Sequence, residues 1–258
     1  MKLREIIKVL EQAAPRQLQD GYDNSGLQLG FPEDEISKVL VCLDVTEEIV
    51  EEAAAGGCNL IVSHHPLIFH ALKQISDTTY QQRCVSKALK AGIAIYSAHT
   101  SLDNAQGGVN YKIAELIGAE ELEWLSAKEG CNAGSGVVGV LKEEMQDADF
   151  LDMLKERFGV ECLRHSEPDG RMIRKVAICG GSGAFLMRDA IAKGADCFVC
   201  GEFHYHDYFE NKGMILAELG HYQSEQFTCE LLRDIVAGVC PEIVCEITGI
   251  NTNPIRYR

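Results

Sequence analysis

Two adjacent histidines, His64 and His65, follow an apolar run that reads as a buried strand and precede Pro66. Successive residues of a strand point to opposite faces of the sheet, so neighbouring imidazoles can serve one centre only where the strand has already ended. Pro66 indicates such an end, because proline cannot donate to a strand ladder. Imidazole nitrogen is a common ligand for divalent metals and a common proton carrier. The pair therefore predicts metal or proton-transfer chemistry at a strand terminus.

Other polar groups stand at comparable places in the chain. His99 and Asp103 follow the apolar run 93–96, and His221 and Glu225 follow the apolar run that ends at Gly220. Residues four apart on a helix share a face, so His221 and Glu225 can reach the same small volume. Each group alone also has a structural interpretation: a histidine at a strand end can simply be hydrogen-bonded, and Asp103 can cap the next helix. Together they favour a metal site.

The ligand types are nitrogen and oxygen without thiolate. Such a set suits several divalent ions and does not distinguish zinc, iron, manganese, cobalt or magnesium. A catalytic zinc site usually takes three protein ligands and a water molecule, and the present candidates are more numerous. Two ions about 3.5–4 Å apart would use them better, with each adjacent imidazole on a different ion and a carboxylate as a bridge. The predicted ligands are His64, His65, Asp103, His221 and Glu225.

The elements that must position these side chains alternate between strand and helix. Apolar runs that predict strands are followed by amphipathic segments that predict helices, several of which stop at glycine. This order predicts an α/β fold with a largely parallel sheet covered by helices, and a site at the carboxyl ends of the strands. The predicted strands are 38–45, 59–63 and 93–99, and the predicted helices are 46–57, 81–92 and 107–118.

The sequence also contains a weak internal repeat. Residues 38–65 align without gaps with residues 175–202, and the alternative is a chance likeness between two ordinary strand–helix–strand units. The repeat predicts two similar α/β halves with a weakly structured joint near 126–136. It places Gly201 and Glu202 over the two histidines. The identities are Lys38/Lys175, Val39/Val176, Cys42/Cys179, Ala53/Ala190, Ala55/Ala192, Gly57/Gly194 and Val62/Val199.

Composition excludes several classes of protein. The 258 residues are 46% hydrophobic and 24% charged, as in ordinary globular proteins. With 24 lysines and arginines against 39 acidic residues the formal net charge is −15, which disfavours nucleic acid and anionic membrane surfaces as partners. No apolar run approaches the length of about 20 residues that spans a bilayer. The first residues predict an amphipathic helix rather than a signal peptide, so a cytoplasmic protein is expected.

Two further motifs have ordinary structural explanations. The 11 cysteines are scattered, and Cys197 and Cys200 fall in a predicted buried strand that would aim them to opposite faces, so neither a disulfide framework nor a thiolate site is expected. The glycine-rich stretch 180–183 precedes a predicted helix. It could cradle a phosphate through its N–H groups, but a tight strand-to-helix turn is the simpler interpretation.

Four stretches in this order identify a family resemblance. "YDNSGLQLG", "SHHP", "HTSLDNAQGGVN" and "GHYQSE" are similar to motifs of the dinuclear-metal Nif3-like family, whose bacterial members are commonly labelled GTP cyclohydrolase type 2 homologues. The resemblance covers nearly the whole chain. It implies the Nif3-like fold, with two similar α/β domains, mixed and mostly parallel sheets flanked by helices, and toroidal homohexamers. The implied domains are 1–125 with 220–258, which binds the metals, and 126–219.

The resemblance also implies roles for residues. The family's metal ligands match His64, His65, Asp103, His221 and Glu225. His99 matches a histidine beside the metals, suited to proton transfer, while His206 and Asp207 match the motif of the second half. Asp23 and Asn24 match a motif with either a turn role or a site role, and His204 is given no role.

Two classes of function remain open. The first is a metal-dependent hydrolase whose two ions lower the pKa of a water molecule, with GTP as the implied substrate, opened at its imidazole ring by hydroxide. His99 would move protons, and Glu202 and His206 would orient the base or the phosphates. The alternative is a non-enzymatic metal-binding, metal-delivery or regulatory hexamer. It stays open because none of the motifs contains residues that would identify guanine as the ligand. An interaction scaffold without chemistry is favoured only if the site holds no metal.

Overall fold

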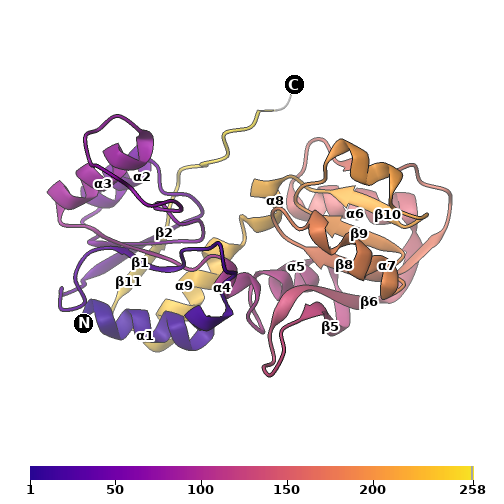
Figure 1. The fold of residues 1–258 in the computed structure, drawn as a ribbon, viewed down its shortest axis with the longest axis horizontal. Helices are drawn as coiled ribbons and strands as arrows, with labels where there is room; N and C mark the ends of the chain where they lie inside the picture. Colours follow the sequence, from indigo (N-terminus) through magenta and orange to yellow (C-terminus); the bar gives the residue numbers. More distant parts are fainter. Residues whose placement is uncertain (257) are drawn as a thin grey trace. The chain divides into compact units, whose positions relative to one another are not determined.

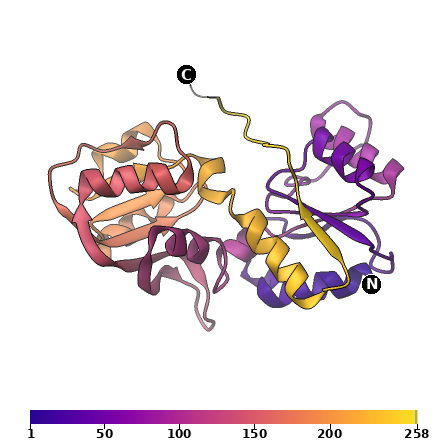
Figure 2. The ribbon, with the colours of Figure 1, turned by 180° about the vertical axis from the view of Figure 1, so that it is seen from behind.

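The computed structural model describes residues 1–256 and 258, and the chain divides into two compact units. Unit 1 comprises Met1–Leu102 and Thr228–Pro254, and unit 2 comprises Asp103–Phe227 and Ile255–Arg258. Each unit contains its own sheet with helices packed on it (Figures 1 and 2). The expected two-domain α/β architecture is thus present. The boundary between the units differs from the expected one, because residues 103–125 belong to unit 2, where they supply a helix and part of a strand.

The sheet of unit 1 is mostly parallel. Its five strands lie in the order β1-β4-β3-β2-β11, and only β1 runs antiparallel to its neighbour. The carboxyl ends of β2, β3 and β4 therefore meet at one edge. The strands are β1 (Gly26–Leu29), β2 (Lys38–Cys42), β3 (Leu60–Ser63), β4 (Ala94–Ser97) and β11 (Val244–Ile247).

The helices of unit 1 follow the predicted start and stop signals. Thr46 caps α2 by accepting a hydrogen bond from the backbone N–H of Ile49, as expected for a threonine at this position. Gly92 ends α3 in the left-handed conformation, with φ of 66°, which a residue without Cβ adopts without strain. The elements are α1 (Leu3–Ala13), η1 (Arg16–Leu18), α2 (Glu47–Ala55), α3 (Tyr80–Ala91) and α9 (Thr228–Val239).

The N-terminal helix has the amphipathic character predicted from its sequence. Leu3, Ile6 and Leu10 are buried on one face of α1, which packs against α9. Among residues 1–256 and 258, no helix combines the length and the apolarity that crossing a membrane requires.

The sheet of unit 2 is mixed, with strand order β5-β6-β8-β9-β10-β7. The central pairs β8-β9 and β9-β10 are parallel, whereas β5, β6 and β7 pair antiparallel with their neighbours. The strands are β5 (Ala119–Ala127), β6 (Gly134–Gln146), β7 (Arg164–His165), β8 (Met172–Cys179), β9 (Cys197–Cys200) and β10 (Ile215–Glu218).

Short helices connect these strands. The helix α5 packs on β5, β6 and β8, and the segment Thr100–Asp103 (α4) precedes it. The core beneath the sheet contains Phe198, Leu216 and Ala177. The helical segments are α5 (Val109–Ile117), α6 (Asp147–Phe158), η2 (Ala184–Leu186), α7 (Met187–Ala192), η3 (Tyr205–Phe209) and α8 (His221–Glu225).

The internal repeat is a structural repeat with one register. Val39 pairs with Leu60 and Cys42 with Ser63 between β2 and β3. At the aligned positions Val176 pairs with Cys197 and Cys179 pairs with Cys200 between β8 and β9. A shift of one residue would exchange the buried and exposed faces of a strand, so identical register preserves the same side-chain directions in both units. The two strand ends that carry His64–His65 and Gly201–Glu202 are therefore equivalent.

The weakly structured joint expected at 126–136 is wrong. This segment is the turn of an antiparallel hairpin between β5 and β6, closed by a hydrogen bond of 2.8 Å from Lys128 N–H to the Ala133 carbonyl. Gly130 adopts φ of 77° within the turn. The run of small and polar residues resembles a linker because a hairpin turn favours the same residue types.

Candidate metal centre

The two adjacent histidines lie just beyond the end of β3. The N–H of His64 donates to the Cys42 carbonyl over 3.2 Å, and the N–H of His65 donates to the Leu43 carbonyl over 3.0 Å. The regular strand stops at Ser63, and the two imidazole centroids are 4.9 Å apart. The chain has left the alternating geometry of a strand, so both rings occupy the same region.

His99 completes a cluster of three imidazoles within unit 1. It follows β4, the neighbour of β3 in the sheet, and its ring centroid lies 5.4 Å from that of His64 and 5.6 Å from that of His65. One ring nitrogen from each of the three histidines lies within 4.8 Å of the other two, an arrangement that could hold a metal ion. Topology thus brings together three of the histidines identified in the sequence.

An oxygen atom fixes each of these rings through Nδ1. His64 Nδ1 lies 2.9 Å from the Ala98 carbonyl, and His65 Nδ1 lies 2.7 Å from Asp44 Oδ1. His99 Nδ1 lies 2.7 Å from Asp23 Oδ1. A carbonyl or carboxylate oxygen can only accept, so Nδ1 carries a proton, and the neutral form of each ring would present the lone pair of Nε2. This is the usual arrangement of metal-binding histidines, in which an outer oxygen sets tautomer and ring direction.

Asp23 is the most heavily hydrogen-bonded of these outer groups. Its side chain is fully buried, and Oδ2 accepts hydrogen bonds from Ser25 Oγ, Thr100 Oγ1 and Thr100 N–H. Burial raises the pKa of Asp23, but the hydrogen bonds and positive charge of His99 and the bond from Thr100 outweigh burial and hold the pKa well below its ordinary value. Asp23 is therefore an ionised anchor for His99, and its N–H also closes a turn by donating to the Asp20 carbonyl over 3.0 Å.

In unit 2, His221 and Glu225 form a second group. Gly220, with φ of 93°, turns the chain from β10 into α8 and places His221 at the first helical position. His221 Nε2 lies 3.2 Å from Glu225 Oε2, as the spacing of four residues predicts. That separation suits two donors on one cation with bonds of about 2.1 Å.

Glu202 holds the other nitrogen of His221. Its Oε1 lies 3.2 Å from His221 Nδ1, and its Oε2 accepts a hydrogen bond of 2.7 Å from Ser182 Oγ. Burial raises the pKa of Glu202, but the Ser182 hydrogen bond and the charge of His221 outweigh it, so the pKa is lowered. Glu202 therefore contacts Nδ1 of His221 as Asp44 contacts Nδ1 of His65, although in the repeat Glu202 occupies the position of His65 itself.

Asp103 belongs with this second group, because a carboxylate oxygen of Asp103 and one of Glu225 lie within 4.8 Å of each other. Asp103 is the last residue of α4 and the first of unit 2, and its carbonyl accepts a hydrogen bond of 3.0 Å from Asn110 Nδ2. His206 lies on η3, exposed, with its ring near those of Tyr205 and Phe209.

The glycine-rich stretch 180–183 forms a tight turn. The N–H of Gly180 donates to Asn110 Oδ1, that of Gly181 donates to Ser224 Oγ, and that of Gly183 donates to the Gly181 carbonyl. These donors are used inside unit 2, so they do not form the cradle that a phosphate would need. The simpler interpretation of this motif is the correct one.

A cavity of about 630 Å³ in unit 2 adjoins Glu202 and His221. It is also lined by Asp207 and by His204, a residue without an expected role. The other lining residues are Arg164, Ser182, Ala184, Phe185, Phe203, Glu218, Gly220 and Ile255.

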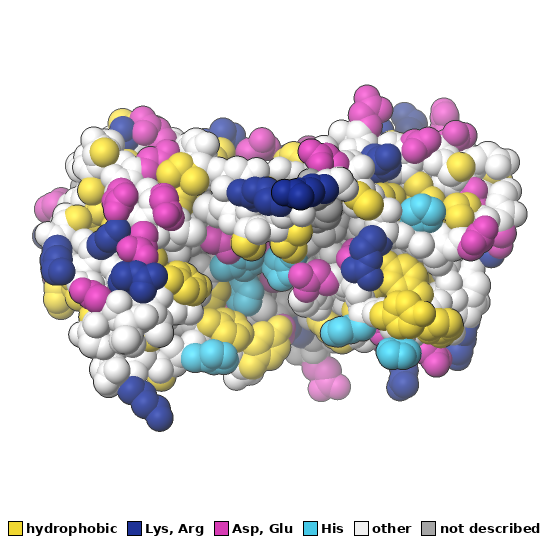
Figure 3. Space-filling model, turned by 90° about the horizontal axis from the view of Figure 1, so that it is seen from above, with side chains coloured by type: hydrophobic (Ala, Val, Ile, Leu, Met, Phe, Trp, Pro, Cys, Tyr) yellow, Lys and Arg dark blue, Asp and Glu magenta, His cyan; other side chains and the backbone are white. Residues whose placement is uncertain are grey.

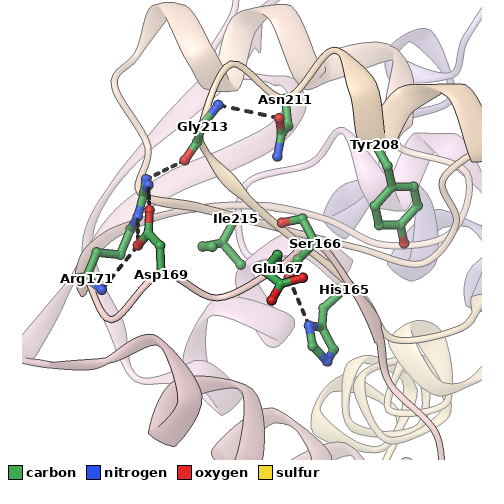
Figure 4. Close-up of a pocket in the computed structure, with 9 residues that line it drawn as sticks. All are labelled: His165, Ser166, Glu167, Asp169, Arg171, Tyr208, Asn211, Gly213 and Ile215. Carbon is green, nitrogen blue, oxygen red and sulfur yellow. Dashed lines mark hydrogen bonds and ion pairs between the residues drawn. The ribbon is translucent and has the colours of Figure 1, made fainter.

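A second cavity of about 410 Å³ lies beside β7 and the start of β10 (Figure 4). Arg171 crosses its wall, pairing with Asp169 and donating to the Gly213 carbonyl, while Asn211 accepts from the Gly213 N–H. Arg171 binds Asp169 and connects it with the loop of Gly213, so we assign these residues a structural role.

Sequence reasoning missed Asp44. It follows β2, whose carboxyl end lies next to that of β3, and its second oxygen accepts a hydrogen bond of 2.8 Å from Thr252 Oγ1. The signal was present, because an acidic residue after a strand is the kind of feature that singled out the histidines. What was lacking was the strand order that places Asp44 beside His65.

Comparison with known proteins agrees with this architecture. A curated relative from Clostridium perfringens, named GTP cyclohydrolase 1 type 2 homolog, is 37% identical over 229 residues, covering 87% of each chain. A Lactococcus lactis relative of the same name is 36% identical, covering 93% of this chain and 94% of its own. The crystal structure of a Staphylococcus aureus hypothetical protein superimposes with a TM-score of 0.93 at 26% identity, covering 100% of this chain and 99% of that chain.

The family model described as Duf34/NIF3 (NGG1p interacting factor 3) matches residues 1–254. Together with the two-sheet fold and the histidine and glutamate groups that could hold a metal, this match shows that the chain belongs to the DUF34/NIF3 family.

Proposed function

We propose that this protein is a metal-dependent hydrolase that uses two divalent ions, held by His64, His65, Asp103, His221 and Glu225. The observation that carries the proposal is the imidazole cluster of unit 1, in which three rings have Nδ1 bound to oxygen and Nε2 directed by those contacts. Nitrogen and carboxylate donors without thiolate suit zinc, iron, manganese or cobalt. Two divalent ions in such a site supply Lewis acidity and lower the pKa of a water molecule toward neutrality.

The residues of the chain divide the remaining tasks. Asp44 and Glu202 orient His65 and His221 through Nδ1. His99 would hold or move a proton at Nε2, because Asp23 occupies its Nδ1 and stabilises the imidazolium that forms when Nε2 takes up a proton.

We propose a nucleotide or a related ring as the substrate, with GTP as the first candidate. Support comes from the name of the relatives, GTP cyclohydrolase 1 type 2 homolog, at 36–37% identity. Ring opening of GTP would release formate, which provides a specific readout. We further propose a homohexamer as the working assembly, which light scattering of the purified protein tests.

The experiment combines metal analysis with turnover. The protein is purified without added metal, the ions per chain are measured by plasma mass spectrometry, and GTP is added while purine absorbance and formate are followed. We expect two ions per chain, and we expect His65→Ala and Glu225→Ala to lose both metal and turnover. His70→Ala is the matched control, because His70 is an exposed histidine of the same segment.

Two outcomes contradict the proposal. Two bound ions without turnover of GTP or other nucleotides would favour the alternative, a metal-binding or regulatory protein. A variant that loses its metal but keeps full activity would remove these residues from the mechanism.

A further inference from the structure

The cavity beside His221 and Glu202 has one aromatic wall. Phe185 lines it and is 64% exposed, so that a large apolar face of the ring is in contact with water. Its neighbour Leu186 is buried in the core of unit 2, and Ala184 packs against the same core. These two residues anchor the short helix η2, and the exposed Phe185 lies between them at the cavity.

The charges in this cavity disfavour an anionic guest. Among the described residues that line it, Arg164 is the one lysine or arginine, and it is paired with Glu218. Glu202 and Asp207 add further carboxylates, which exceed the positive charge of Arg164 and repel phosphate groups. The N–H groups of Gly180 and Gly181 in the adjacent turn donate to Asn110 and Ser224, so these two donors do not offset this repulsion.

The same groups suit a ring that carries N–H donors. Each carboxylate oxygen has more than one lone pair, so Glu202 can accept a further hydrogen bond besides those from Ser182 and His221. A volume of about 630 Å³ is ample for a bicyclic heterocycle. On the unit 2 part of the surface, at the right of Figure 3, hydrophobic side chains lie next to histidines.

We propose that this cavity binds a planar nitrogen heterocycle, neutral or cationic, stacked on Phe185, and that it does not bind the phosphate chain of a nucleotide. The inference deepens the proposed function and rests on it, since it assigns the part of the same site that recognises the substrate's ring. Phe185 is thereby a specificity-determining residue.

The test measures binding of three probes, guanosine, GTP and inorganic tripolyphosphate, by calorimetry and saturation-transfer NMR, with metal-free and metal-loaded protein. Guanosine should bind in both states, and Phe185→Ala should weaken that binding by roughly tenfold, the loss expected when one base–aromatic stack is removed. Phe185→Trp should retain it. Phe209→Ala is the matched control, because Phe209 is 69% exposed in the same unit but does not line the cavity.

Three results overturn the inference: no binding of guanosine, binding that Phe185→Ala leaves unchanged, or tripolyphosphate displacing guanosine from the metal-free protein. Similar binding of guanosine and GTP by the metal-free protein supports a ring subsite that serves nucleosides and nucleotides alike. If guanosine binds through Phe185 while the loaded protein turns over no nucleotide, this inference stands and the hydrolase proposal fails. Equal melting temperatures of the Phe185 and Phe209 variants verify that both are folded.

Discussion

Gly181 lies directly against the carboxylate of Glu225, so that a Cβ added to this glycine would collide with Glu225 Oε1. Its φ is 56°, and its N–H donates to Ser224 Oγ over 3.0 Å. The absence of a side chain at 181 is therefore what allows Glu225 to take its position. This relationship connects the glycine-rich turn to the candidate metal ligand rather than to a phosphate.

Gly181→Ala should cause a large loss of bound metal but only a modest loss of folding stability. The displaced carboxylate cannot keep its place beside His221, whereas the left-handed backbone costs an alanine roughly 1–2 kcal/mol. Plasma mass spectrometry and thermal unfolding measure the two effects. Gly194→Ala is the control, since Gly194 has φ of 69° and open space around its Cβ position. Equal metal content in the two variants would contradict the prediction.

Asp44→Asn should weaken metal binding while leaving the fold intact. An asparagine that turned its amide N–H₂ toward His65 Nδ1 would disturb the tautomer that Asp44 Oδ1 now selects. Loss of such an outer partner typically lowers metal affinity about 10–100-fold. Competition with a chelating indicator measures the affinity. Asp234→Asn, which alters an exposed carboxylate paired with its neighbour Arg233, should leave the affinity unchanged. A loss of affinity in both variants would point to a general charge effect.

Asp23→Asn should destabilise unit 1. Asp23 accepts from His99, Ser25 and two groups of Thr100, and an amide cannot satisfy all of these donors. A buried donor without an acceptor costs about 1–3 kcal/mol, which urea unfolding resolves. Asp234→Asn should change the free energy of unfolding by no more than about 0.5 kcal/mol. Indistinguishable unfolding curves would show that Asp23 is not an anchor.

Asp147 should make the free energy of unfolding of unit 2 fall at acidic pH. The residue is buried, and burial raises its pKa, but hydrogen bonds from the backbone N–H groups of Asp169, Gly170 and Ala148 outweigh burial and lower the pKa below the ordinary 3.8. A lowered folded pKa gives stability that is fully present above the unfolded pKa and is lost as pH falls through the folded value.

Asp147→Asn should therefore reduce stability at neutral pH and flatten its decline below about pH 4. Urea unfolding measures this at a series of pH values from roughly 2 to 7, a range that covers the titration of carboxyl groups. Asp149→Asn is the control on the same helix, because Asp149 is exposed. Parallel pH profiles for the parent and Asp147→Asn would exclude this role.

The sequence by itself determined the types of the candidate ligands and the local elements. The alternation of apolar and amphipathic segments gave α2, α3, α5 and the strands between them, and the repeat predicted the shared register of β2-β3 and β8-β9. The pairing of His221 with Glu225 also followed from spacing alone, because helical geometry is local.

Only the tertiary structure decided which groups meet. Strand order placed Asp44 and Asp23 on His65 and His99, across 21 and 76 residues of sequence, and no periodicity encodes such contacts. The tertiary structure also shows a hairpin where a joint was expected, and it places residues 103–125 in unit 2. In the same unit His204, rather than His206, lines the cavity. The reason is physical: local pattern fixes what a segment forms, whereas the partners of a side chain depend on how buried surfaces pack together.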